Sequence, residues 1–101
     1  MEEQVENREE ERHSHPLVVT VHNEDEGGEP IKIQGEPESR VEEIIKKLYQ
    51  DLGTSREDGD RLYCLANGDD VFPHADQHLR TYAEHVCKAL EWGFSRPTGG
   101  A

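Results

Sequence analysis

Basic residues are scarce in this chain of 101 residues. Eleven lysines and arginines stand against 23 aspartates and glutamates, so the net charge is −12 at neutral pH. Nucleic acids and anionic membranes both attract basic surfaces, so this balance argues against either one as a direct partner. It favours solubility and protein partners with basic docking faces.

Long hydrophobic runs are also missing, and cysteines are few. Hydrophobic residues make up 32% of the chain, no run approaches membrane-spanning length, and the acidic start is unlike a signal peptide. We therefore expect a cytoplasmic protein. The two cysteines, Cys64 and Cys87, have neither C-x-x-C nor metal-ligand spacing. In that compartment we expect both to be reduced and buried.

Apolar residues are nearly absent from residues 1–15, which hold six glutamates and, besides Met1, only Val5. Such a segment cannot bury enough apolar surface to offset the entropy lost on ordering. We expect a disordered acidic arm over 1–15, one folded domain over 16–94 and a flexible tail over 95–101. A folded part of about 80 residues is long enough for one hydrophobic core.

The first half of the domain predicts two strands and a helix. Residues 17–22 are β-branched, 30–34 alternate apolar and polar, and the acidic, glycine-containing loop between them predicts an antiparallel hairpin. Ser39 and Glu42 have capping-box spacing, and Gly53 predicts the end of a helix over 39–52. Its apolar stripe consists of Val41, Ile44, Ile45, Leu48 and Leu52.

The second half predicts shorter elements. We expect strands at 61–65, 71–72 and 87–94, an Asn67-Gly68 hairpin turn, and a short helical turn over 74–83 with Leu79 and Tyr82 facing inward. An alternative stays open, because Leu79, Tyr82, Val86 and Leu90 also fit a helical period. A helix of three or more turns across 79–92 would contradict the strand interpretation.

The chain closes with Thr98-Gly99-Gly100-Ala101. Glycine lacks a Cβ, so a Gly-Gly pair enters channels that exclude other residues. An enzyme that reaches a C-terminal carboxylate through a narrow slot would need such a pair, and Ala101 would be a cap that a peptidase removes first. The alternative is an ordinary frayed terminus.

Four motifs in order resemble ubiquitin and its β-grasp relatives over residues 17–100: EPESRVEEIIKKLYQDLG, DRLYCLANGDDVF, HLRTYA and RPTGG. The resemblance implies an α+β fold, with a mixed sheet packed on one main helix. The chain departs from the family in its acidic first loop, in a turn at Asn67-Gly68 that is one residue longer, and over 83–92, which do not align cleanly.

The nearest kin implied are ubiquitin-like modifiers of bacterial conjugation operons. The resemblance then implies a modifier that is not itself an enzyme and holds no metal or cofactor. A JAB-type or similar peptidase would remove Ala101, and an E1-like enzyme would use ATP to adenylate Gly100. An E2-like enzyme would pass Gly100 to a protein target.

Further site residues follow from the same resemblance. Arg96, Pro97, Thr98 and Gly99 would be read as the tail by the activating enzyme, with a solvated side chain as the alternative for Arg96. Tyr63 matches the centre of ubiquitin's partner-binding patch, and Phe94 or Trp92 would lie beside it. For Trp92 we favour the core. The histidines, including His74 and His78, are expected to be ordinary surface residues, since no further ligand lies at suitable spacing.

Two other functions stay open. Small β-grasp sulfur carriers also end in Gly-Gly and are adenylated, although they usually lack a residue after the glycines and an acidic arm. In a non-conjugating ubiquitin-like interaction module, the Gly-Gly pair would be a coincidence.

Overall fold

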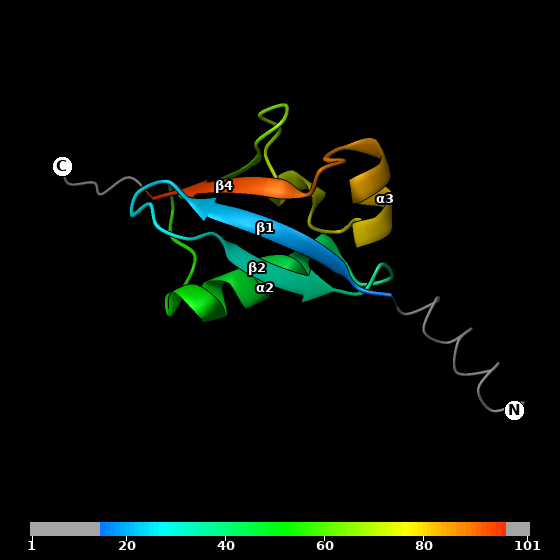
Figure 1. Ribbon diagram of the computed structural model, residues 1–101, viewed down its shortest axis with the longest axis horizontal. Helices are drawn as coiled ribbons and strands as arrows, with labels where there is room; N and C mark the ends of the chain where they lie inside the picture. Colours follow the sequence, from blue (N-terminus) through cyan, green and yellow to red (C-terminus); the bar gives the residue numbers. More distant parts are fainter. Residues whose placement is uncertain (1–14, 97–101) are drawn as a thin grey trace, which may run out of the picture.

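The computed structural model describes residues 15–96 and shows an α+β arrangement (Figure 1). Four strands form one mixed sheet in the order β2-β1-β4-β3. In chain order the elements are β1 (Leu17–Asn23), β2 (Ile31–Gly35), α2 (Val41–Leu52), β3 (Arg61–Cys64), the 3-10 helix η1 (Phe72–His74), α3 (Leu79–His85) and β4 (Glu91–Ser95).

The register of the sheet places β4 between β1 and β3. β1 and β2 pair antiparallel, with Leu17 opposite Gly35, which confirms the predicted hairpin. β4 runs parallel to β1 and antiparallel to β3. The last strand therefore lies inside the sheet.

Helix α2 ends where the sequence predicts but begins differently. Gly53 ends it in the left-handed conformation, with φ of 75°. The predicted capping box of Ser39 and Glu42 is wrong, because Arg40 is the N-cap residue and no side chain caps the helix. The first amides instead donate to carbonyls from another segment, Val41 to Gln77 at 2.8 Å and Glu42 to Ala75 at 3.0 Å. These bonds satisfy helix-end donors that a capping side chain would otherwise take.

The core lies between α2, α3 and the sheet. Val41, Ile44 and Leu48 of the predicted stripe have no exposed surface, and the same holds for Leu62 of β3 and for Leu79 of α3, in agreement with its predicted inward position. Tyr82 and Trp92 are fully buried as well, which confirms the core interpretation of Trp92. Ile45 and Leu52, at the margin of the α2 stripe, pack against this core while partly buried.

The stretch from the Asn67-Gly68 turn to β4 combines correct and incorrect predictions. The turn forms, with Gly68 at φ of 78° and its amide bonded to the Cys64 carbonyl. No strand forms at 71–72, because the pairing with β3 is limited to an isolated bridge at Asp70 and Phe72 already begins η1. The helical period is realised only over Leu79–His85, and the last strand, predicted over 87–94, forms only over Glu91–Ser95.

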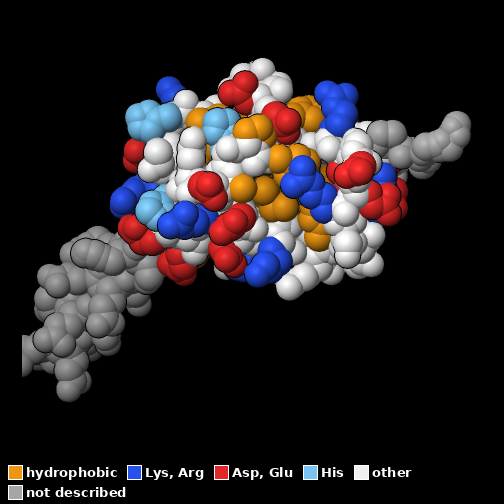
Figure 2. Space-filling model, turned by 180° about the vertical axis from the view of Figure 1, so that it is seen from behind, with side chains coloured by type: hydrophobic (Ala, Val, Ile, Leu, Met, Phe, Trp, Pro, Cys, Tyr) orange, Lys and Arg blue, Asp and Glu red, His pale blue; other side chains and the backbone are white. Residues whose placement is uncertain are grey.

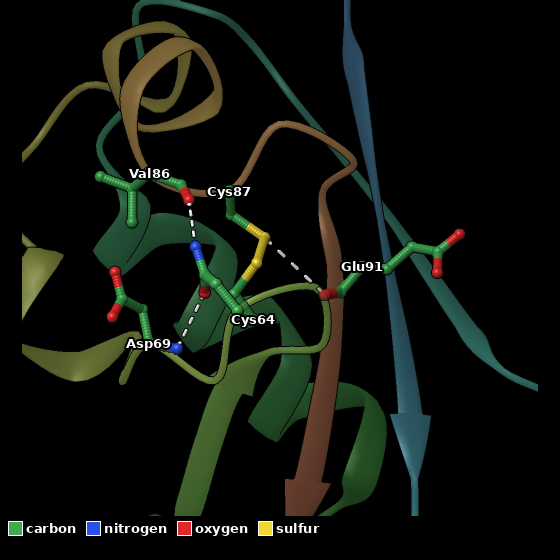
Figure 3. The surroundings of a disulfide bond; sticks show 6 residues. Cys64, Asp69, Val86, Cys87 and Glu91 are labelled. Carbon is green, nitrogen blue, oxygen red and sulfur yellow. Dashed lines mark hydrogen bonds between the residues drawn. A yellow bond between two sulfur atoms is a disulfide. The ribbon is translucent and has the colours of Figure 1, made fainter.

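A disulfide joins Cys64, at the end of β3, to Cys87, which follows α3 (Figure 3). The expectation of two reduced cysteines is therefore wrong, although both residues are fully buried as predicted. Their separation of 23 positions in the sequence carries no spacing signal for pairing. The fold brings them together, because the Asn67-Gly68 turn and α3 both return the chain to the end of β3.

The surface mixes side-chain types. On the face turned away in Figure 1, hydrophobic side chains gather near the middle, with acidic and basic groups around them (Figure 2). Within residues 15–96, no helix combines the length and the apolar character that crossing a membrane requires.

Candidate functional site

The base of the C-terminal tail is the part of the predicted site that the structure describes. β4 ends at Ser95, and Arg96 is the last described residue. Pro97, Thr98, Gly99, Gly100 and Ala101 lie outside the described residues, so their roles in processing, recognition and conjugation stay predictions.

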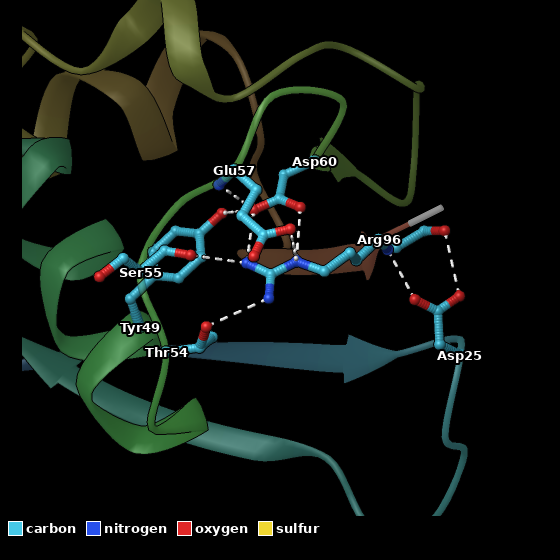
Figure 4. Close-up of polar contacts among 8 residues, drawn as sticks. Asp25, Tyr49, Thr54, Ser55, Glu57, Asp60 and Arg96 are labelled. Atoms are coloured by element: carbon cyan, nitrogen blue, oxygen red, sulfur yellow. Dashed lines mark hydrogen bonds and ion pairs between the residues drawn. The ribbon is translucent and has the colours of Figure 1, made fainter. Parts of the chain in front are cut away.

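Arg96 binds a carboxylate of its own domain (Figure 4). Its Nε donates to Asp60 Oδ1 at 2.8 Å, and its Nη2 donates to Asp60 Oδ2 at 2.9 Å. This two-pronged geometry matches the planar guanidinium to the planar carboxylate. Nη1 also donates to the Thr54 hydroxyl at 3.2 Å, and Nη2 to the Ser55 carbonyl at 2.7 Å.

Asp60 lies in a polar environment supplied by the fold. Its side chain has no exposed surface, while that of Arg96 is 23% exposed. Besides Arg96, it accepts hydrogen bonds from the Tyr49 hydroxyl of α2 at 2.6 Å and from the Glu57 amide at 2.9 Å. The hydrogen bonds from Arg96, more than any other contact, hold the pKa of the Asp60 carboxyl well below its usual range.

The pKa values of two partners of Asp60, Tyr49 and Arg96, are shifted upward. The pKa of the Tyr49 hydroxyl is raised, first by burial and then by its hydrogen bond to the Asp60 carboxylate. The pKa of Arg96 is raised mainly by its hydrogen bonds to Asp60. The cluster is therefore fixed in one charge state across the physiological range, with Asp60 anionic, Arg96 cationic and Tyr49 neutral.

A second carboxylate holds the backbone at the same point. The Arg96 amide donates to Asp25 Oδ2 at 2.6 Å, and the Ser95 hydroxyl donates to Asp25 Oδ1 at 3.2 Å. Asp25 belongs to the loop between β1 and β2, whereas Asp60 directly precedes β3. Two separate loops thus fix the direction in which the chain leaves the sheet.

For Arg96 the sequence analysis predicted either contact with the activating enzyme or a solvated side chain. The structure shows instead that its hydrogen-bond partners lie within the chain. Sequence reasoning missed Asp60, Tyr49 and Asp25. One signal was available for Asp60: β3 and β4 pair antiparallel with Arg61 opposite Ser95, and continuing that register places Asp60 opposite Arg96. A correct register between the predicted strands would have found this pair.

A hollow of about 450 Å³ lies beside the cluster. Leu52 and Phe94 supply apolar wall, and Asp25, Glu26 and Arg96 supply charge. The two carboxylates would repel a phosphate group, so the hollow suits a neutral or basic segment better than a nucleotide.

The predicted partner-binding patch is only partly assembled. Tyr63 is half-buried on the sheet face opposite the core, directly beside Gly93 of β4, where an added Cβ would lie 2.7 Å from the Tyr63 Cζ. Hydrogen bonding to Glu24, and to a lesser degree burial, raises the pKa of the Tyr63 hydroxyl.

Phe94 does not lie beside Tyr63 in an exposed cluster, so this part of the prediction is wrong. It is 4% exposed, pairs with Leu62 in the sheet and packs edge-on against Tyr49, with ring centroids 5.9 Å apart. Because side chains alternate between the faces of a strand, Tyr63 and Phe94 point to opposite sides of the sheet.

Within residues 15–96, no three His, Cys, Asp or Glu side chains are grouped to hold a metal ion. The described site is built on one buried carboxylate, Asp60, and one arginine, Arg96. Comparison of the sequence with models of protein families gave no match, and comparison with curated proteins gave none either.

Proposed function

We propose that the chain is a ubiquitin-like protein modifier with a β-grasp fold, conjugated through Gly100 after the removal of Ala101. The α+β arrangement supports this proposal, because one long helix follows the first hairpin and the last strand runs parallel to the first inside a mixed sheet.

The observation that carries the proposal is the short stretch of sequence between the end of the sheet and the Gly-Gly pair. β4 ends at Ser95, Arg96 is held at the rim, and Gly99 and Gly100 follow after only two further residues. A glycine pair without side chains, a short distance from a fixed exit point, suits an enzyme that must grip the domain and reach the terminal carboxylate.

The chemistry then runs in five steps at the Gly100 carboxyl group. A peptidase of JAB or similar type hydrolyses the Gly100–Ala101 amide and releases alanine. The new carboxylate attacks the α-phosphorus of ATP on an E1-like enzyme, and pyrophosphate leaves. A cysteine thiolate of that enzyme displaces AMP to form a thioester. After transfer to an E2-like enzyme, an amine of the target displaces the thiolate and loses a proton.

The modifier itself contributes no catalytic group in this scheme. It contributes the acyl terminus and a recognised surface, which includes Tyr63 and the tail residues Arg96 to Gly99. ATP binds to the activating enzyme, and we place the process in the cytoplasm, where ATP is available, which requires the buried Cys64–Cys87 disulfide to persist there. The partners are the E1-like enzyme, the E2-like enzyme, the peptidase and a protein target.

The proposal is tested by comparing two forms of the chain in ATP–pyrophosphate exchange with the E1-like enzyme of the source organism. The form that ends at Gly100 should support exchange. The form that keeps Ala101 should not, because its Gly100 carbonyl is tied up in an amide. Gly100→Val should abolish processing and exchange, since a β-branched side chain would obstruct a slot shaped for glycine.

Mass spectrometry of the protein from its source cells gives the complementary result. An isopeptide adduct at Gly100 supports the modifier. Equal exchange by both forms, or Ala101 intact in every molecule, would contradict it. A terminal gain of sulfur for oxygen would instead identify a sulfur carrier.

A further inference from the structure

Arg96 has little bonding capacity left for an enzyme. Four hydrogen bonds leave its guanidinium, two to Asp60 and one each to Thr54 and Ser55. A guanidinium has five N–H donors, so a single one remains. An enzyme carboxylate that took over this side chain would have to displace the bidentate partner that the fold already provides.

The receptor for Arg96 belongs to the domain and not to the tail. Asp60 is buried and is held from its other side by Tyr49 of α2 and by the Glu57 amide. Removing Arg96 would leave this carboxylate in place but without its cation, which is costly for a buried charge.

The backbone is fixed at the same residue. Asp25 accepts the Arg96 amide, and the Glu24 amide donates to the Phe94 carbonyl at 2.9 Å, so the parallel pairing of β1 and β4 extends to the rim. Contacts from two loops and from the sheet therefore converge at the end of β4 and on Arg96, at the base of the tail (Figure 4).

We propose that Arg96 is a positioning residue, which acts through Asp60 to fix the point where the tail leaves the domain and thereby sets the reach of Gly100. This inference rests on the proposed function, and it replaces direct contact with the enzyme as the role of Arg96. Four residues lead from Arg96 to Gly100, and an extended chain of that length spans at most about 14 Å. With so short a reach, the position and direction of Arg96 decide where the Gly100 carboxylate lies.

Freeing that first residue should weaken productive binding without changing the chemical step. An unanchored residue loses backbone freedom when the tail enters the enzyme, and ordering one residue costs enough to weaken binding by about 5- to 30-fold. The KM for the modifier should therefore rise by this factor while kcat changes little. A merely destabilised modifier would also raise the apparent KM, because only its folded fraction binds, so each KM is calculated on the folded concentration measured by circular dichroism.

The test is a double-mutant cycle in ATP–pyrophosphate exchange, using chains that end at Gly100. Asp60→Asn and Arg96→Gln should each raise KM by about 5- to 30-fold, and the double variant should raise it no further, because both changes remove the same anchor. Arg80→Gln is the matched control, since Arg80 makes an exposed ion pair with Glu38 at 3.2 Å, away from the tail. It should leave KM unchanged.

Direct enzyme contact predicts a different pattern. Asp60→Asn would then release the guanidinium for the enzyme, so KM would fall or stay constant while Arg96→Gln still raised it. That result would overturn the inference.

A second measurement needs no enzyme, so it separates this inference from the proposed function. In the isolated protein, the heteronuclear 15N NOE at Arg96 and Thr98 should fall in Asp60→Asn and in Arg96→Gln but not in Arg80→Gln. Unchanged values would overturn the anchor even if the wild type is activated. A fall in the NOE together with a wild type that no E1-like enzyme activates would support the anchor and contradict the proposed function.

Discussion

Asp60 shows how the surroundings of a single residue determine what it contributes. The carboxylate accepts hydrogen bonds from Arg96, Tyr49 and the Glu57 amide, and all three favour the ionised form. A buried charge with these partners stabilises the fold only while it stays ionised. Stability should therefore depend on pH through this residue.

The first prediction concerns acid. The folded-state pKa of Asp60 lies below that of an unfolded aspartate, about 3.9, so its contribution is fully present above about pH 5 and is lost as pH falls below about 4. The difference in melting temperature between the wild type and Asp60→Asn should be constant from pH 5 to 8 and shrink below pH 4. Asp58→Asn, at an exposed position of the same loop, controls for charge alone. A difference that grew on acidification would contradict this assignment.

At this scale the sequence predicted the importance of individual residues better than the contacts between residues. Arg96 was found because the RPTGG motif resembles a known tail, but its partner was not. The pairing with Asp60 depends on the register between two strands and on the burial of one carboxylate, neither of which has a local pattern. Phe94 was misplaced for a related reason: its position on β4 was correct, but the face it occupies follows from the pairing with Leu62.

At the scale of elements, the end of helix α2 is determined by local sequence, whereas its start is determined by a distant segment of the chain. Its apolar stripe and Gly53 are local signals, and both were read correctly. Its start was not, because the first amides bond to carbonyls at Ala75 and Gln77, about 35 residues further along. A serine with capping-box spacing is therefore no guide when another segment satisfies the same donors.

The disulfide was missed for the same reason, since its partners become neighbours only in the folded chain. Cys64 ends β3, and Cys87 precedes β4, the strand from whose end the tail leaves. The bond therefore joins the end of β3 to the segment that leads from α3 into β4.

The second prediction tests this link. A disulfide across 23 residues of sequence should stabilise the domain by about 3 kcal/mol, chiefly by restricting the unfolded chain. Reduction, or a variant with Cys64→Ser and Cys87→Ser, should lower the melting temperature by more than about 10 °C. Calorimetry with and without reductant measures this drop. Identical melting under both conditions would contradict the stabilising role, provided that thiol titration finds no free thiols without reductant and two with it.

At the scale of the whole molecule, the charge is unevenly spread along the sequence. Residues 1–15 contain six glutamates and two arginines, which is −4 of the total net charge of −12. Within residues 15–96, the buried core extends from Val19 to Phe94. The apolar residues of the core therefore lie in one part of the chain, and a third of the net charge lies in another.

The last prediction follows from this separation. Deleting residues 2–15 should leave the melting temperature within about 2 °C of the full chain, because the segment offers almost no apolar surface to bury and its removal slightly reduces self-repulsion. Thermal unfolding followed by circular dichroism, at low and at moderate salt, measures this directly. A control chain in which the six glutamates are replaced by glutamine separates charge from length. A drop of 5 °C or more on deletion, but not in the control, would show that the arm packs on the domain through its backbone or Val5. A similar drop in both would show that its charges bind there instead.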